Sequence, residues 1–150
     1  MSDNFSLIIK NGACYIDGKL TKTDIGLSGN KIKKIGKIEL NSSKVYDATD
    51  KVVLPGIIDT QVHFREPGST DAEDLESGSR AAVLGGVTSL FEMPNTNPPT
   101  ANLVEFEKKL KAAKNRMHSN YAFYFGATPQ NTRSEEHTSE LQSPDQLVCR

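Results

Sequence analysis

The sequence has no long apolar run, no excess of one charge and only two cysteines, and each absence excludes a class of protein. No stretch approaches the roughly 20 apolar residues that span a bilayer, and the start lacks the basic and apolar regions of a signal peptide. A formal net charge of −1 favours neither nucleic acid nor a membrane as a partner. Cys14 and Cys149 form no metal or redox motif, so we expect free thiols and a cytoplasmic protein.

The residues that are present divide the chain into three parts. With 36% hydrophobic and 25% charged residues among 150, the whole is typical of a globular protein. Residues 1–55 carry strand patterns, and residues 56–132 alternate between strand and helix patterns. Residues 133–150 have neither pattern, so we treat them apart from the fold.

The last part, residues 133–150, is polar and without usable periodicity, which alone would predict a disordered loop. A widely used short-read sequencing adapter, translated in one frame, resembles residues 133–143, and a later portion of it encodes residues 147–150. We therefore predict a non-native tail, and His137 and Cys149 receive no functional weight.

Residues 1–55 are expected to form a small β-sandwich domain or an open barrel. Short apolar runs end at Asn11-Gly12, Asp17-Gly18 and Gly29-Asn30, which are pairs typical of hairpin turns. The isoleucines of residues 31–38 do not keep a period of two, which predicts a bulge or an edge strand. Strands at this spacing, continuing to Leu54, predict a set of antiparallel pairs.

The second part predicts the start of a parallel α/β fold. Strands are expected at 57–59, 87–93 and 120–125, with a first helix that Thr70 caps, with Glu73 in the capping-box position, and Gly85-Gly86 ends. Strands that alternate with helices favour a parallel sheet with right-handed crossovers. In a (β/α)₈ barrel the chemistry lies on loops after the strands, which here are residues 60–68 and 93–99.

A second helix is expected between the last two strands. Asn102 is its predicted cap, and Glu105 is predicted to pair with Lys109 on the solvent face. The apolar positions recur at spacings of three and four, which predicts a face directed at the core; they are Leu103, Phe106, Leu110, Ala113 and Met117.

The first of the two loops offers candidate metal ligands. Gln61 and His63 are two residues apart, so on a strand their side chains face the same way. A neutral imidazole is a good ligand for a divalent metal. A lone histidine after a strand is more often a packed or solvated residue, so the surrounding motif decides between the two interpretations.

The motif resembles a known family. The segment LPGIIDTQVHFREPG is similar to the first-strand signature of the amidohydrolase superfamily, whose usual form is Asp-x-His-x-His. Together with the later EMPNTNPPT, it resembles dihydroorotase over roughly residues 6–130. The resemblance implies a small β-sandwich domain followed by a metal-dependent (β/α)₈ TIM barrel. In this chain the barrel is expected to be truncated after about its third strand.

The resemblance also implies roles for individual residues. His63 matches a metal-binding histidine for one or two zinc ions, and Arg65 matches the arginine that grips the α-carboxylate of the substrate. Asn95 matches the asparagine that helps to hold the same carboxylate. The alternatives are a surface ion pair between Arg65 and Glu66 and a turn role for Asn95 between prolines.

The implied reaction is the reversible, zinc-dependent hydrolysis of (S)-dihydroorotate to N-carbamoyl-L-aspartate in de novo pyrimidine biosynthesis. The family's remaining ligands, a carboxylated lysine and two histidines, and its aspartate for proton transfer would lie beyond residue 132. No catalytic residue can therefore be assigned in this chain. Because three strands and two helices cannot close a barrel, we expect the fragment to fold poorly and to be inactive.

Position 61 departs from the family pattern, which has a histidine there, and a carboxamide oxygen is a poorer zinc ligand. Gln61 is a weak ligand, or one of two metal positions is lost, or the protein is a non-catalytic dihydroorotase-like subunit that partners aspartate transcarbamoylase. Another cyclic amidohydrolase, an allantoinase or hydantoinase, is a rival that lacks the combined motifs. The expected substrate is a small molecule, dihydroorotate or N-carbamoyl-L-aspartate.

Overall fold

A computed structural model describes residues 4–39 and 44–131. The predicted tail, with His137 and Cys149, lies outside these residues. The chain divides into two compact units, Met1–Pro55 and Gly56–Arg150, and each is described by itself. No helix in the described part of the chain is long and apolar enough to cross a membrane.

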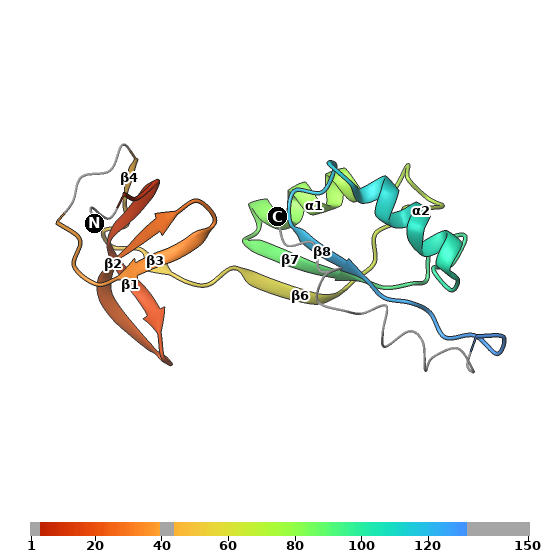
Figure 1. Cartoon of the computed structure of the whole chain (residues 1–150), viewed down its shortest axis with the longest axis horizontal. Coiled ribbons are helices and arrows are strands. Elements are labelled where there is room, and N and C mark those ends of the chain that lie inside the picture. The colour runs from red at the N-terminus through yellow and green to blue at the C-terminus, as the bar shows by residue number, and fades with distance from the viewer. Residues whose placement is uncertain (1–3, 40–43, 132–150) are drawn as a thin grey trace. The chain divides into compact units, whose positions relative to one another are not determined.

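The first unit is built on one sheet (Figure 1). Its strands are β1 (Leu7–Ile16), β2 (Lys19–Ser28), β3 (Lys31–Ile35), β4 (Val45–Asp47) and β5 (Val52–Val53). The order is β3-β2-β1-β4, and β5 also pairs with β1. The hairpins β1–β2 and β2–β3 are antiparallel, whereas β4 and β5 run parallel to β1, so the expectation of a wholly antiparallel set is wrong.

The hairpin predicted at Asn11-Gly12 is also wrong, because β1 continues through this pair. The register with β2 shifts between Ile9 and Gly12, and Asn11 has φ of 63°, which marks a β-bulge. The same left-handed preference that makes Asn-Gly a turn signal makes it suitable for a bulge. A Cβ added to Gly12 would lie 2.7 Å from Cγ2 of Val53, so glycine also allows β5 to approach.

The bulge predicted for residues 31–38 is confirmed. Gly26 faces Lys34 while Leu27 faces Ile32, so β3 contains one extra residue between these pairs. The buried side chains Phe5, Ile8 and Ile38 form the core cluster of this unit.

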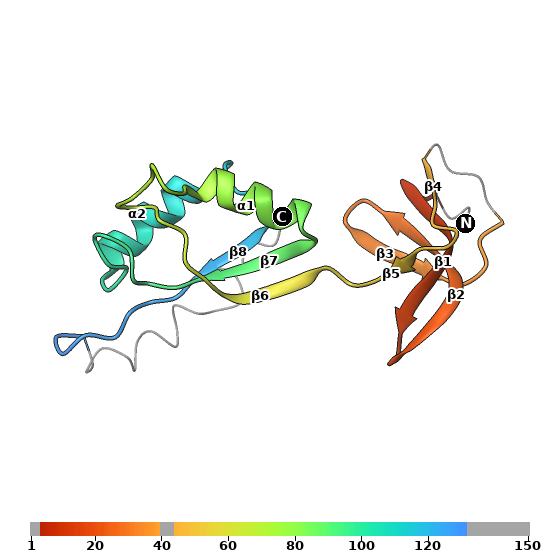
Figure 2. The same ribbon diagram turned by 180° about the vertical axis from the view of Figure 1, so that it is seen from behind.

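The second unit has the predicted order of strand, helix, strand, helix, strand. Its elements are β6 (Ile57–Val62), α1 (Leu75–Leu84), β7 (Val87–Glu92), α2 (Leu103–Ala113) and β8 (Asn120–Phe123). The three strands are parallel in the order β6-β7-β8. Both helices cover the same face of the sheet (Figures 1 and 2). The prediction of an α/β chain with a β unit followed by the start of a barrel is confirmed.

The core of this unit lies between the sheet and the two helices. Phe64, Leu75, Leu90 and Ala113 form its buried cluster. Because Phe64 lies immediately after the candidate ligand His63, the buried ring fixes the loop that leaves β6.

The first helix begins later than predicted. Asp74, not Thr70, is the N-cap: its carboxylate accepts the backbone N–H of Ser77, whose side chain completes a capping box with the backbone N–H of Asp74. An acidic N-cap accepts a hydrogen bond from an otherwise unpaired N–H and interacts favourably with the positive end of the helix dipole. Asp74 is therefore preferred to Thr70 as the N-cap. The predicted end is confirmed, because α1 stops before Gly85 and Gly86 has φ of 89°.

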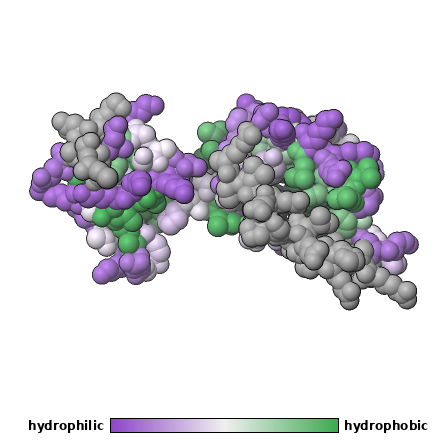
Figure 3. Space-filling view, viewed as in Figure 1, coloured by the Kyte–Doolittle hydropathy of each residue, from purple (hydrophilic) through white to green (hydrophobic). Residues whose placement is uncertain are grey.

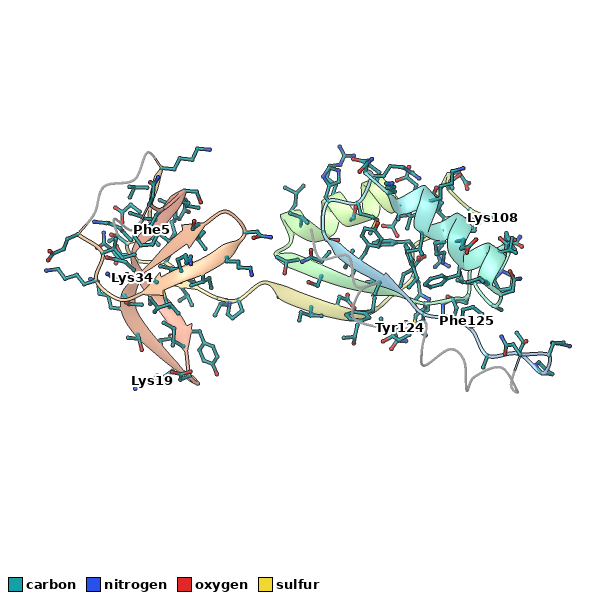
Figure 4. All side chains as sticks on the ribbon, viewed as in Figure 1. Phe5, Lys19, Lys34, Lys108, Tyr124 and Phe125 are labelled. Carbon is teal, nitrogen blue, oxygen red and sulfur yellow. The ribbon has the colours of Figure 1, made fainter. Side chains whose placement is uncertain are left out.

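The second helix is capped as predicted by Asn102, whose side chain accepts the backbone N–H of Glu105. The predicted pair of Glu105 with Lys109 is wrong. Glu105 pairs with Lys108, which lies on the outer side of α2 (Figure 4). Lys109 follows Phe106 by three residues and precedes Ala113 by four, so it belongs to the buried face, and its side chain is 1% exposed.

Apolar side chains remain exposed on both units (Figure 3). In the second unit Leu84 is 84% exposed and Ile58 60% exposed. Among the described residues β6 and β8 each pair only with β7, so each leaves one strand edge open. These open edges and exposed side chains are what the first part of a larger barrel would present.

The N-cap can be tested by substitution. We expect Asp74→Ala to lower stability by about 1 kcal/mol, because it removes the acceptor for the Ser77 N–H. Thr70→Ala is the matched control, since Thr70 is exposed and precedes the helix. Thermal unfolding of the full-length protein checks this; an equal or larger effect of Thr70→Ala would contradict the assignment.

Candidate functional site

The two loops singled out by sequence leave the carboxyl ends of neighbouring strands. β6 and β7 are parallel partners, and Val62 is paired with Glu92 at their ends. The backbone N–H of Met93 then donates to the carbonyl of Val62 at 2.9 Å. Residues 63–68 and 93–99 therefore start side by side, at the edge where parallel α/β folds place their chemistry.

The structure brings His63 and Asn95 into contact. His63 Nδ1 lies 2.9 Å from Asn95 Oδ1, although both residues are exposed. A carboxamide oxygen can only accept, so Nδ1 is the donor and Nε2 of the neutral ring keeps its lone pair. A histidine held in this way has the tautomer and orientation that metal-binding histidines adopt.

Gln61 lies on β6, exposed, and its backbone N–H donates to the Asp59 carboxylate. Asp59 is paired with Leu90 and Val62 with Glu92, so β6 has an extra residue between them. Regular alternation is therefore interrupted between Asp59 and Val62, a stretch that includes Gln61, so the strand period alone does not place Gln61 and His63 on one face.

The two loops are also joined further along. The backbone N–H of Asn97 donates to the carbonyl of Pro67 at 3.0 Å. Gly68 has φ of 126°, and a Cβ there would lie 3.1 Å from both Cβ and the carbonyl oxygen of Asn97. Glycine is required at this position by conformation and by the closeness of the second loop, so the loops form one unit.

Arg65 is exposed, and its carbonyl accepts the backbone N–H of Ser69. The alternative of a surface pair between Arg65 and Glu66 is wrong. Glu66 instead accepts two hydrogen bonds from the guanidinium of Arg116, at 2.7 and 3.0 Å, and one from the backbone N–H of Leu75. Within the described residues no ion pair involves Arg65.

The hydrogen bond from Arg116 is the largest cause that lowers the pKa of Glu66, opposed by partial burial and aided by the Leu75 N–H. Glu66 is therefore ionised at neutral pH. It ties the loop after β6 to the start of α1 and to the turn after α2.

A buried ion pair lies directly behind the second loop. Glu92 is the last residue of β7, and its carboxylate is 3.1 Å from Lys109 Nζ, with both side chains 1% exposed. Lys109 also lies over the ring of Phe123, 5.4 Å from the centroid. Burial outweighs the attraction to Lys109 and raises the pKa of Glu92 to about 7.

Sequence reasoning missed Glu66, Glu92, Lys109 and Arg116. A signal for Lys109 was available, because it occupies a core-facing position on a helix and a buried lysine needs an acidic partner. The partner of Glu66 is 50 residues away, and no local pattern indicates it.

The described residues contain no group of three or more His, Cys, Asp or Glu side chains that could hold a metal ion. The candidate donors are His63 and Gln61. The Asn95 contact leaves His63 Nε2 with a lone pair, so this residue fits a metal, while the set is too small to hold one alone.

A hollow near these elements lies elsewhere. A space of about 620 Å³, lined in part by Leu110, Met117 and Tyr121, lies at the amino end of β8. Catalytic groups of (β/α)₈ enzymes lie at the opposite, carboxyl ends of the strands. The two loops remain the candidate site.

Comparison with known proteins decides the family. Residues 52–146 match the amidohydrolase family, a range that includes both loops and extends into the predicted tail. The chain belongs to the amidohydrolase family.

Curated relatives of this amidohydrolase chain include a dihydroorotase and an allantoinase. The dihydroorotase of Lactobacillus helveticus is 39% identical over 129 residues, which cover 86% of this chain and 30% of that protein. The allantoinase of Salmonella choleraesuis is 41% identical over 115 residues, covering 76% of this chain and 25% of that protein. Overall sequence identity therefore does not distinguish dihydroorotase activity from allantoinase activity for this chain. The chain spans less than a third of either relative.

Among solved structures, the L-hydantoinase of Arthrobacter aurescens has a TM-score of 0.82 and 30% identity. It covers 91% of this amidohydrolase chain, which covers 31% of that protein. The fold of both described units is therefore that of the first part of such an enzyme.

The Glu92–Lys109 pair predicts a pH dependence. Below about pH 4.5 Glu92 is protonated in both states; up to about pH 7 only the folded state holds the proton, because the folded pKa is raised from 4.5 to about 7. The free energy of unfolding should therefore fall as the pH rises through this range. Glu92→Gln, which cannot ionise, should flatten that fall in thermal unfolding of the full-length protein.

The matched control is Glu107→Gln, which removes an exposed carboxylate of the same helix that carries Lys109. The control should keep the slope of the parent protein. If Glu92→Gln also keeps that slope, Glu92 does not bind its proton differently in the folded and unfolded states.

Proposed function

We propose that the full-length protein is a dihydroorotase that hydrolyses the cyclic amide of (S)-dihydroorotate to N-carbamoyl-L-aspartate, reversibly and with zinc. The observation that carries the proposal is the 2.9 Å contact between His63 and Asn95. The contact joins His63, a candidate metal ligand, to Asn95, which lies on a second loop and is a candidate for binding the carboxylate of the substrate. Arg65 lies two residues beyond His63 on the same joined pair of loops.

Arg65 is the residue assigned to the α-carboxylate of the substrate. Its planar guanidinium meets a carboxylate with two parallel hydrogen bonds. Its sequence neighbour Glu66 is engaged by Arg116, so Glu66 does not compete for it. An exposed arginine at the mouth of the loops suits recognition of an anionic ring.

Asn95 is assigned a double role. Its Oδ1 accepts from His63, which leaves both N–H groups of its carboxamide as donors for the substrate carboxylate. The same side chain can thus orient the imidazole and bind the substrate. The observed contact with His63, which lies in another loop, favours a functional role for Asn95 over the alternative of a turn residue.

His63, through Nε2, and Gln61, as a weaker ligand, are assigned to one or two zinc ions. Bound zinc would lower the pKa of a water molecule and polarise the amide carbonyl. The described residues supply neither a complete ligand set nor a general base, so we assign those roles to the chain beyond residue 132. Histidine at position 63 is held in its tautomer by Asn95.

A second candidate is hydrolysis of another cyclic amide, such as allantoin or a hydantoin. It is favoured by the 41% identity to an allantoinase and by the fold shared with a hydantoinase. The combined His63-Phe-Arg and Pro94-Asn-Thr motifs favour dihydroorotate instead, because they supply two groups for an α-carboxylate that allantoin lacks.

A third candidate is a non-catalytic dihydroorotase-like subunit that binds aspartate transcarbamoylase, favoured by Gln61. The native gene beyond codon 132 decides this point. A lysine, two histidines and an aspartate at strand ends would support the enzyme, and their loss would support the subunit. The same sequence tests whether residues 133–150 are non-native.

Further proposals follow from the same assignment. We assign residues 1–55 to the small β domain and residues 56–132 to the first part of the barrel. The proposed substrate is a small molecule, and the proposed pathway is pyrimidine biosynthesis. We also propose that the protein is cytoplasmic.

The direct test is turnover by the full-length protein. We expect zinc-dependent turnover of dihydroorotate, and a loss of about 10- to 100-fold in kcat/KM for Arg65→Gln, since hydrogen bonds to charged groups contribute about 1.5–3 kcal/mol. Arg80→Gln is the control, as Arg80 is exposed on α1.

Turnover of allantoin or a hydantoin in place of dihydroorotate would move the assignment to the second candidate. An inactive full-length protein with a complete metal site would contradict the proposal altogether.

A further inference from the structure

Glu66 presents a problem for any anion that Arg65 is to bind. The two residues are adjacent in a loop, and a carboxylate beside a guanidinium is its most available partner. The structure resolves this competition through a third residue, Arg116.

Arg116 lies in the turn after α2, and its backbone N–H donates to the carbonyl of Ala113. Its Nη1 donates to Glu66 Oε1 at 2.7 Å and its Nη2 to Oε2 at 3.0 Å. Nη1 also donates to the carbonyl of Ala112 at 3.2 Å. The guanidinium is thus fixed to the end of the helix and grips both carboxylate oxygens.

The start of α1 holds the same carboxylate. The backbone N–H of Leu75 donates to Glu66 Oε2 at 3.0 Å, and this group belongs to the positive end of the helix dipole. The side chain of Glu66 is 16% exposed, so little of it remains open to solvent or to Arg65. Asp74 lies 3.7 Å from Arg116 Nη2 and adds to the same cluster.

We propose that Arg116 is a positioning residue that withholds the Glu66 carboxylate from Arg65, and so leaves Arg65 available for the carboxylate of the substrate. This rests on the proposed function, which assigns the carboxylate of the substrate to Arg65. Without Arg116, only the Leu75 N–H holds the Glu66 carboxylate, so the carboxylate can turn to the neighbouring Arg65, pair with its guanidinium and repel an incoming anion.

This role differs from simple anchoring of the loop. If the pair only anchors the loop, removing either partner does the same harm, because the ion pair is lost in both cases. If Arg116 withholds a competing carboxylate, removing Arg116 harms binding, whereas removing the charge of Glu66 does not.

The test uses the full-length protein and measures the Kd of N-carbamoyl-L-aspartate by calorimetry, with dihydroorotate turnover measured separately. Arg116→Met should weaken binding about tenfold, the scale of one hydrogen bond to a charged group. Glu66→Gln should stay within about threefold of wild type on the same scale. The double variant should bind like Glu66→Gln, so the second substitution rescues the first.

Arg80→Met removes a more exposed arginine whose partner is Glu76, and it should leave the Kd unchanged. Arg116→Lys keeps one charge on Glu66 and covers the case in which Arg116→Met does not fold; its Kd should lie between those of wild type and Arg116→Met. Circular dichroism reports folding for each variant.

If Glu66→Gln and the double variant both bind the ligand as weakly as Arg116→Met, the proposal is overturned, and the ion pair serves only to anchor the loop. Unchanged binding by Arg116→Met, or by Arg116→Lys if the former is unfolded, would also overturn it. If the wild-type protein binds N-carbamoyl-L-aspartate but does not turn over dihydroorotate, the proposed function is contradicted and the role of Arg116 is not. Wild type that does not bind the ligand overturns both.

Discussion

The parallel pairing of β6 with β7 is the constraint on which the candidate site depends. It aligns the carboxyl ends of the two strands, and the hydrogen bond from Met93 to Val62 carries the alignment into the loops. Only because the loops start together can His63 contact Asn95, 32 residues later. The candidate side chains are exposed, so the pairing of the backbone strands that precede them, rather than burial of their own atoms, sets their positions.

Two ion pairs, one partly exposed and one buried, lie next to the two loops. Glu66 is gripped by Arg116 at the side of the first loop, and Glu92 meets Lys109 beneath the second. The buried pair is a weak source of stability, since desolvation of both groups offsets their attraction. The pair links the end of β7 to the buried face of α2, where substitution of either partner would leave an uncompensated buried group.

Much of this could be predicted from sequence, because local patterns report local structure. The alternation of strands and helices, the cap at Asn102 and the two loops all follow from periodicity and turn chemistry over a few residues. The bulge at Asn11 was mistaken for a turn because both use the same backbone conformation. The Glu66–Arg116 pair could not be predicted, since it joins the loop after β6 to the turn after α2 over a separation of 50 residues.

We propose above all that Arg65 and Asn95, on two loops held together, receive one carboxylate beside the candidate metal ligand His63. A crystal structure of the full-length protein with zinc and N-carbamoyl-L-aspartate tests it most directly. We predict the α-carboxylate within hydrogen-bond distance of the Arg65 guanidinium and the Asn95 amide, with zinc on His63 Nε2. A carboxylate bound away from both loops, or zinc bound without His63, would contradict the account.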